Sequence, residues 1–383
     1  MNKNLDTMIC HLKDFAPFKD IANSSHFPIY NTATFDLRDQ NSNKTYDYTR
    51  SDNPTRESLE NFFAFAENGA GAVCTHTGIA SVALLFETVL KANSTILVEA
   101  DCYGGTFRLL KVYKEKYNLN IIFTNFNDLN MIEHILKSNS VDLALCESPT
   151  NPGLKMIDLE KVAKLCKEND TLFAVDNSLA TFISQKPLDL GADFSLFSTT
   201  KFISGHGSVI AGAIVAKTEK LSNKLHFYSN AFGRNQNPMD VFLISLGVSS
   251  LKVRMKASEK SAKKLAKWLE KQNFIKKVTF PALKSYPQRT LAKKQLRIIP
   301  SVFCADFKDE KLAEKFIKNA NIFGEKCSFG SADSRVEIPA KISHASFSID
   351  ELKAIGITNS TVRFSIGFES IKDLKNDILQ AIK

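Results

Sequence analysis

Lys201 is the residue of this sequence best placed to do chemistry. It follows the apolar run Phe194–Phe197 and stands in a turn rich in Ser, Thr and Gly. Because lysines are rarely buried, a lysine at the end of a buried strand is expected to have a lowered amine pKa or a covalent carbonyl partner. Both conditions favour Schiff-base chemistry. This segment alone favours a simpler alternative, a lysine at a chain bend that reaches solvent.

A carboxylate 25 residues earlier reverses that preference. Asp176 lies at the end of a second short apolar run, within residues 171–177. Two parallel strands deliver such an acid and amine to one edge of a sheet, the edge at which open α/β sheets bind ligands. Proteins hold pyridoxal phosphate with an acid at the pyridine nitrogen and a lysine on the aldehyde. The pair therefore predicts a pyridoxal phosphate site, although neither motif is specific alone.

A phosphate-binding site is predicted next to Lys201 and Asp176. Gly78 and Ile79 would begin a helix directly after a strand, and backbone N–H groups at a helix N-terminus bind phosphate. Ser198 and Thr200, beside Lys201, can add hydroxyl donors. One such turn is weak evidence, because many α/β loops look like it. Together, the helix start and the two hydroxyl groups nevertheless predict that a lysine and a phosphate-binding site lie in one crevice.

Two further side chains have open interpretations. Tyr103, beside Gly104 and Gly105, can stack on a planar ring or simply cover the edge of the core. Arg363 follows a strand-like alternation with no evident acidic neighbour, so it is a candidate for binding a substrate carboxylate. Pairing with an acid inside the fold is an equally good alternative for this arginine.

The amino-terminal region is polar and shows little periodicity, except that residues 46–55 concentrate aromatic, acidic and basic side chains. Arg50 suits bidentate contact with phosphate. An arm that reaches into an adjacent subunit is therefore a concrete possibility.

From Ser58 onward, helical segments alternate with short apolar strands, which is typical of a mostly parallel sheet with helices on both faces. The alternation ends after residue 216, and a helix over residues 256–271 is expected to lead into a smaller α/β domain. We therefore predict three parts: an arm (1–57), a cofactor-binding domain (58–250) and a carboxy-terminal domain (251–383).

Composition narrows the class of protein. The formal charge of +9 suits an anionic cofactor, but the basic residues are dispersed, so nucleic-acid binding is not expected. Seven cysteines without a C-x-x-C motif argue against disulfides and a metal site, and favour a reducing compartment. No apolar stretch approaches a membrane span, and the start has no apolar signal core. We expect a soluble cytoplasmic protein of 383 residues with no membrane contact.

With these residues assembled, the chain resembles the Cys/Met-metabolism family of pyridoxal-phosphate enzymes from about Pro28 to its end. This family includes cystathionine γ-synthase, cystathionine γ-lyase, methionine γ-lyase and O-acetylhomoserine sulfhydrylase. Many ordered blocks make the resemblance specific: they lie at residues 46–55, 69–73, 101–106, 147–152, 174–178, 198–207 and 361–369.

The resemblance implies fold type I of the pyridoxal-phosphate transferases, with a mostly parallel seven-stranded sheet, and an active dimer commonly paired into a homotetramer. It implies that Lys201 holds the cofactor and removes the Cα proton, that Asp176 keeps the pyridine nitrogen protonated, and that Tyr103 stacks on the ring and assists proton transfer. The implied phosphate ligands are Gly78, Ile79, Ser198, Thr200 and, from the partner subunit, Tyr48 and Arg50. The implied substrate-binding residues are Asp47, Asn151, Ser328 and Arg363.

Departures from the family pattern guide the choice of reaction. Cys327 replaces the usual glutamate, which weakens handling of a second ammonium group such as that of cystathionine. The stretch at residues 246–251 lacks its usual basic residue, Gly207-Ser208 is closer to sulfhydrylases, and Gly105 stands where methionine γ-lyases place a cysteine.

The leading hypothesis is γ-replacement, in which a thiol displaces the acyl group of an O-acylhomoserine, as in cystathionine γ-synthase. Alternatives are a sulfhydrylase using sulfide, and a γ-lyase acting on cystathionine or methionine. A non-catalytic homologue is a more remote alternative from a different class. The sequence leaves the acyl group and the thiol open.

Overall fold

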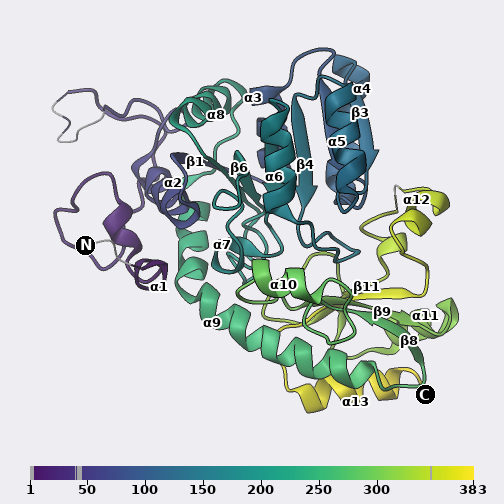
Figure 1. Cartoon of the computed structure of the whole chain (residues 1–383). Helices are drawn as coiled ribbons and strands as arrows, with labels where there is room; N and C mark the ends of the chain where they lie inside the picture. The colour runs from purple at the N-terminus through teal and green to yellow at the C-terminus, as the bar shows by residue number, and fades with distance from the viewer. Residues whose placement is uncertain (1–3, 39, 41–44, 346) are drawn as a thin grey trace.

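Two β-sheets organise the chain, a larger one in the amino-terminal half and a smaller one in the carboxy-terminal half (Figure 1). The computed structural model describes residues 4–38, 40, 45–345 and 347–383. The predicted arm, residues 1–57, thus includes positions outside the described residues. In the described part of the arm, short helices α1 (Leu5–Met8) and η1 (Leu12–Phe15) precede an extended segment.

The larger sheet is seven-stranded and mostly parallel, as predicted. Its order is β1-β7-β6-β5-β4-β2-β3, and only β7 runs antiparallel to its neighbours. Because the other six strands point the same way, their carboxyl ends meet at one edge. The strands are β1 (Gly71–Thr75), β2 (Thr95–Glu99), β3 (Asn120–Thr124), β4 (Leu143–Glu147), β5 (Leu172–Asp176), β6 (Phe194–Phe197) and β7 (Gly212–Ala216).

Helices cover this sheet, and local capping explains where several begin. Asn53, Asp128 and Asp158 each accept backbone N–H groups at a helix N-terminus. The helix that Asn53 caps starts at Pro54, so the predicted end of the arm at residue 57 falls in its first turn. The helices are α2 (Pro54–Glu67), α3 (Gly78–Val89), α4 (Gly104–Tyr117), α5 (Leu129–Ser138), α6 (Leu159–Glu168), α7 (Thr181–Ser184) and α8 (Glu219–Phe232).

The smaller sheet has the order β10-β11-β12-β9-β8 and is mainly antiparallel. Its strands are β8 (Ile275–Thr279), β9 (Val302–Phe307), β10 (Gly324–Glu325), β11 (Arg335–Glu337) and β12 (Thr361–Ser365). The accompanying helices are α10 (Arg289–Gln295), α11 (Glu310–Asn319), η2 (Pro339–Lys341), α12 (Ile349–Ala354) and α13 (Ile371–Ala381). Among the described residues, no helix is both long and apolar enough to cross a lipid bilayer.

The long helix α9 (Pro238–Leu269) joins the two halves (Figure 1). It contacts α2 on one side of the molecule, and β8, β9 and α13 on the other. The prediction that this helix begins at residue 256 was wrong by more than four turns, and the proposed domain boundary at residue 250 lies inside it. Gly and Ser between residues 245 and 250 are weak helix formers, and tertiary packing overrides that preference here.

Aromatic packing stabilises the smaller sheet. The Phe316 ring, fully buried on α11, stacks on Phe307 with centroids 5.5 Å apart and on Phe364 with centroids 5.6 Å apart. It also meets the edge of Phe323 at 5.8 Å. This cluster fixes α11 against strands β9 and β12.

We expect Phe316→Ala to lower the free energy of unfolding by about 3–5 kcal/mol, because it leaves a cavity among the three rings. Urea denaturation followed by tryptophan fluorescence measures the change. The matched control is Phe227→Ala, whose side chain is 68% exposed, and a loss of under about 1 kcal/mol is expected there. Equal losses in both variants would contradict the packing argument.

Candidate active site

A cavity of about 620 Å³ lies where the carboxyl ends of β1, β4, β5 and β6 face the smaller sheet. Strand ends contribute most of its lining, and the smaller sheet contributes the opposite wall. Ten of the residues predicted from the sequence line it: Gly78, Ile79, Tyr103, Asn151, Asp176, Ser198, Thr200, Lys201, Ser328 and Arg363. The topology therefore brings together side chains that are up to 285 positions apart in sequence.

Lys201 occupies the centre of this set. Its Nζ donates a hydrogen bond to Ser328 Oγ at 2.6 Å and lies 5.2 Å from the centroid of the Phe329 ring. Burial, aided by the neighbouring guanidinium of Arg363, lowers the pKa of Lys201 to about 8. At such a pKa roughly a tenth of the amine is unprotonated at pH 7, which is far more than for an ordinary lysine. An unprotonated amine is what attack on a carbonyl and removal of a proton both require.

Two carboxyl groups form one side of the cavity, that of Glu147 buried and that of Asp176 partly buried. Asp176 at the end of β5 lies opposite Glu147 at the end of β4. Burial raises the pKa of Asp176, while hydrogen bonds from Ser178 oppose the rise. Burial and the charge of Asp176 raise the pKa of Glu147, whose Oε1 accepts the backbone N–H of Tyr103. Paired carboxyls in a desolvated site favour a cationic partner, which a protonated ring nitrogen supplies.

The amino end of α3 offers donors at another side of the cavity. The N-cap Thr77 accepts the N–H of Ala80, and the N–H groups of Gly78 and Ile79 have no intrahelical partner. A Cβ on Gly78 would lie 2.6 Å from the Cβ of Ser198, so glycine lets the two loops approach. These donors suit an anion.

The two predicted hydroxyl donors, Ser198 and Thr200, differ in whether their hydroxyl is already hydrogen-bonded within the chain. Thr200 Oγ1 accepts the N–H of Ala211 at 2.8 Å and donates to the Ala211 carbonyl at 3.1 Å. Its proton is therefore already used. Within the described part of the chain, no residue hydrogen bonds to the hydroxyl of Ser198, which leaves that hydroxyl able to donate to a phosphate.

Tyr103 stands at the start of α4, with a ring that is 40% exposed and lines the cavity. A Cβ on Gly105 would come 2.4 Å from this ring, so a larger residue at position 105 would force the ring to move. Glycine at this position thus helps set the ring orientation. Burial raises the pKa of the Tyr103 hydroxyl and the charge of Arg108 opposes the rise.

The structure shows the alternative that the sequence left open for Arg363, which is pairing with an acid inside the fold. Arg363 Nη1 lies 3.1 Å from Glu337 Oε1, and both side chains are buried. Nη1 also donates to Asn151 Oδ1, and Nη2 donates to the carbonyl of Ser328, each at 2.9 Å. A guanidinium has five N–H donors, so two remain after these three contacts. Arg363 can therefore be paired structurally and still bind a carboxylate.

Three predicted residues lie elsewhere. Asp47, Tyr48 and Arg50 do not line the cavity of their own chain. Tyr48 is 43% exposed, and Arg50 donates to the backbone carbonyl of Asn230 on α8 at 2.8 Å. Their role at the site therefore stays a prediction that depends on a second subunit.

Sequence reasoning missed several cavity residues. Glu147 and Ser178 received no role, although both follow strand ends just as Asp176 does. Their position at the end of a strand was the sequence signal that could have identified them as site residues. Arg108 on α4 and Cys327 beside Ser328 also line the cavity. For Arg108 no local pattern gave a signal, because an exposed arginine on a helix is usually solvated.

Arg254 was missed as well, and it supports the turn that carries Lys201. Its Nη1 donates to the carbonyl of Phe202 at 2.7 Å, and its Nη2 donates to those of Ile203 at 3.0 Å and Gly247 at 2.7 Å. These acceptors are uncharged, and burial lowers the pKa of Arg254 to about 10. The guanidinium thus fixes the two residues that follow Lys201.

We expect Arg254→Lys to lower the free energy of unfolding by about 2–3 kcal/mol, because an ammonium group cannot reach three carbonyls at once. Arg254→Met should cost at least as much. Urea denaturation measures both changes. The exposed Lys256, on the same helix, supplies the control Lys256→Met. Full stability of Arg254→Lys would contradict the positioning role.

The residues present fit pyridoxal phosphate. Acids lie on one side of the cavity, unpaired helix N–H groups on another, and a lysine with a lowered pKa between them. This donor set matches the ring nitrogen, the phosphate and the aldehyde of that molecule.

Comparison with known proteins agrees with this fit. A family model described as "Cys/Met metabolism PLP-dependent enzyme" matches residues 7–383. The cystathionine beta-lyase of Coxiella burnetii is 35% identical over 358 residues, which cover 93% of this chain and 92% of that protein. The L-methionine gamma-lyase of Fusobacterium nucleatum subsp. polymorphum is 33% identical over 377 residues, which cover 95% of this chain and 95% of that protein.

Solved structures give the same result. The cystathionine gamma synthase from Xanthomonas oryzae pv. oryzae, in complex with cystathionine, has a TM-score of 0.95 and 32% identity. The similarity covers 100% of this chain and 98% of that one. The predicted resemblance and the fold type I architecture are therefore confirmed. The chain belongs to the Cys/Met metabolism family of enzymes, which depend on pyridoxal phosphate.

Proposed function

We propose that this enzyme catalyses γ-replacement, in which a thiol displaces the acyl group of an O-acylhomoserine. The observation that carries the proposal is the charge at the cavity mouth, where Arg108 supplies a cation and Cys327 replaces the glutamate of the family pattern that the sequence resembles. The carboxyls that line the cavity are Glu147 and Asp176, both at strand ends. The mouth therefore suits a substrate whose distal group is anionic or neutral.

In this proposal each side chain has a defined task. Arg363, held by Asn151 and Ser328, binds the substrate carboxylate with its remaining N–H donors. Lys201 Nζ takes the proton from Cα in its unprotonated form, which the lowered pKa makes more abundant than in an ordinary lysine. When bound, pyridoxal phosphate accepts the electron pair that this proton leaves behind. Asp176 keeps the ring nitrogen protonated, and Tyr103 covers the ring face.

The reaction at Cγ balances as a substitution. After the Cα proton, a proton on Cβ is removed, and the acyl group leaves with the electrons of the Cγ–O bond as a free carboxylate. The thiol then forms a Cγ–S bond and gives up its proton, and protons return to Cβ and, from Lys201, to Cα. The exposed Arg108 can pair with a carboxylate on the acyl group, as an O-succinyl substrate would carry.

A lyase is the second candidate. The similarity of this chain to proteins named cystathionine beta-lyase and L-methionine gamma-lyase favours it. A lyase would use the same Lys201 and Arg363, and it would release a 2-oxo acid and ammonia in place of a thioether.

The proposed active unit is a dimer, assembled further into a tetramer. Tyr48 and Arg50 would complete the phosphate site of the adjacent subunit, and Asp47 would approach its substrate. Their exposure, and their position outside the cavity of their own chain, support this arrangement.

The purified enzyme is expected to replace the acyl group of O-succinylhomoserine by a thiol, with sulfide and cysteine supplied separately as acceptors. We expect Arg108→Met to raise the KM for O-succinylhomoserine about tenfold or more, because a charged hydrogen bond worth about 1.5–3 kcal/mol is lost. The measurement is product formation by mass spectrometry over a range of substrate concentrations.

O-acetylhomoserine is the matched control, because its acyl group carries no charge and its KM should not change in Arg108→Met. Rapid release of a 2-oxo acid from cystathionine or methionine alone, with little γ-replacement, would overturn the synthase assignment in favour of a lyase.

The pH dependence of cofactor attachment tests Lys201 independently of substrate. Because the protonated amine is unreactive, the rate at which the apoprotein binds pyridoxal phosphate covalently should rise with pH through a midpoint near 8. Stopped-flow absorbance measures this rate. Lys201→Arg should show no covalent binding. A midpoint near 10, as for an ordinary lysine, would contradict the desolvated environment.

A further inference from the structure

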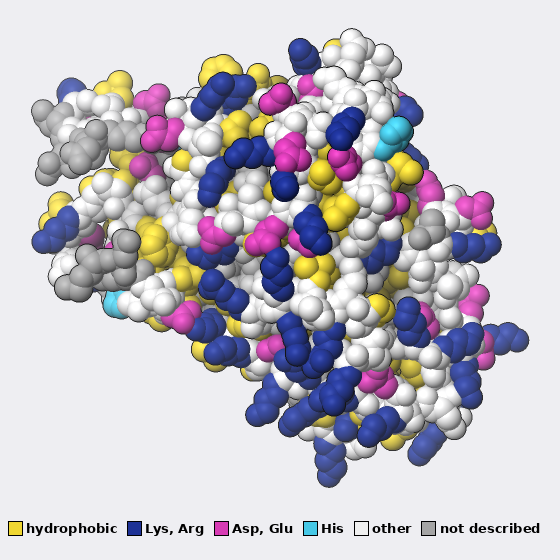
Figure 2. All heavy atoms as spheres, viewed as in Figure 1, with side chains coloured by type: hydrophobic (Ala, Val, Ile, Leu, Met, Phe, Trp, Pro, Cys, Tyr) yellow, Lys and Arg dark blue, Asp and Glu magenta, His cyan; other side chains and the backbone are white. Residues whose placement is uncertain are grey.

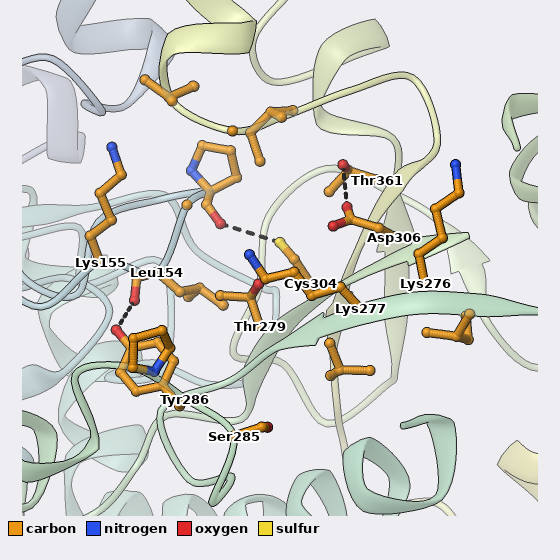
Figure 3. A pocket seen from close by; sticks show the side chains of 18 of the residues that line it. Leu154, Lys155, Lys276, Lys277, Thr279, Ser285, Tyr286, Cys304, Asp306 and Thr361 are labelled. Carbon is orange, nitrogen blue, oxygen red and sulfur yellow. Dashed lines mark hydrogen bonds between the residues drawn. The ribbon is translucent and has the colours of Figure 1, made fainter. Parts of the chain in front are cut away.

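A second cavity, of about 570 Å³, lies behind the active-site loop that carries Asn151. One wall is the segment Pro152–Lys155 of the larger half, and the other is the face of β8, β9 and β12 in the smaller half (Figure 3). Tyr286 and Val278 contribute apolar surface. Its volume falls in the range of small-molecule sites.

The charged groups of this cavity are mainly basic. Lys155, Lys276, Lys277 and Lys353 line it, against two acids. Figure 3 shows Lys155 and Lys276 on opposite sides of the space. Figure 2 shows Lys and Arg side chains gathered over the smaller half of the molecule, so the surrounding potential also attracts anions.

The two acids already have partners. Asp306 Oδ1 accepts the hydroxyl of Thr361 at 2.6 Å (Figure 3), and Glu270 accepts the hydroxyl of Ser285. By contrast, no ion pair joins Lys276 or Lys277 to any residue in the described ranges. The ammonium groups of Lys276 and Lys277 are therefore available to a ligand, whereas Lys155 Nζ already lies 4.0 Å from the buried Asp101 Oδ2.

An irregularity in β8 explains the two adjacent lysines. The register shifts between Ile275, which pairs with Phe307, and Lys277, which pairs with Asp306. Lys276 is the extra residue of this bulge, and bulges redirect side chains next to sites. Lysines on an edge strand such as β8 can also serve to block pairing with the strands of other chains. That role does not explain why these lysines line a cavity.

The wall of the cavity is tied across the two halves. Cys304 Sγ contacts the carbonyl of Pro152 at 3.2 Å, and the Tyr286 hydroxyl donates to the carbonyl of Leu154 at 2.5 Å (Figure 3). Thus the backbone that borders this cavity continues directly into Asn151, which holds Arg363.

We propose that this cavity binds an organic anion with two or more negatively charged groups, either carboxylates or phosphate esters, through Lys276 and Lys277, with Lys155 adding positive charge from the opposite wall. The anionic groups lie between these lysines, and the body of the ligand lies against Tyr286 and Val278. The cavity is separate from the one that fits pyridoxal phosphate: their linings share no residue.

Equilibrium dialysis of the holoenzyme tests this site with citrate as the carboxylate probe and ADP as the phosphate-ester probe. We expect saturable binding of at least one of them, with one site per subunit, and the tighter probe identifies the anionic group. Adenosine, which has the body of ADP without its charge, should bind at least about tenfold more weakly. Saturable binding of neither anion, or adenosine binding as tightly as ADP, would overturn the proposal.

A charge-matched pair of variants locates the site. Lys276→Gln with Lys277→Gln should weaken binding at least about tenfold. Lys315→Gln with Lys318→Gln removes the same charge from exposed positions on α11 outside the cavity and should leave binding unchanged. Equal binding by both double variants would place the anion elsewhere and overturn the assignment.

The shared loop also couples the two cavities, a point that rests on the proposed role of Arg363 in binding the substrate carboxylate. L-norleucine, an amino acid with no γ leaving group, should change the Kd of the anion, and the anion should change the Kd of L-norleucine by the same factor. A factor of one would overturn the coupling. The binding assignment is measured without substrate, so failure of the proposed function would leave it intact.

Discussion

The desolvated amine of Lys201 is the constraint on which the active site depends. An amine whose pKa falls to about 8 exists only where water is excluded and positive charge lies nearby, and burial and Arg363 supply these conditions. Keeping such a group in place requires a rigid support. Arg254 binds the carbonyls of the two residues that follow Lys201, and Gly247 lets α9 approach the same turn.

The smaller half of the chain is part of this support. Ser328 accepts the hydrogen bond of Lys201, and Arg363 forms the wall facing the strand ends. Neither half has a complete site alone, because acids and phosphate donors come from the larger sheet and the carboxylate-binding group from the smaller one. The loop around Asn151 joins them, with one cavity on each side. This arrangement makes the loop the natural place for one cavity to sense the other.

Sequence patterns predicted the larger sheet well, because each of its strands is a short apolar run bounded by turn residues. The apolar run Phe194–Phe197 has the same bounds as β6, and the run within residues 171–177 contains β5. The start of α9 was missed because Gly247 and its serine neighbours disfavour an isolated helix, whereas close contact with the Lys201 turn requires a small residue there. The sequence left pairing of Arg363 open but could not name its partner, because Glu337 belongs to another strand, 26 positions away.

The sequence by itself determined the elements, the strand-end positions of Lys201 and Asp176, and the family, since these depend on local periodicity and on short motifs. Only the tertiary structure decided which end-of-strand side chains share a cavity. It placed Glu147 beside Asp176 and put Arg108 at the mouth of the cavity. It also gave Arg363 an ion pair while leaving two of its N–H donors unused. The physical reason is that charge, desolvation and hydrogen-bond competition depend on neighbours in space, and those neighbours come from distant parts of the chain.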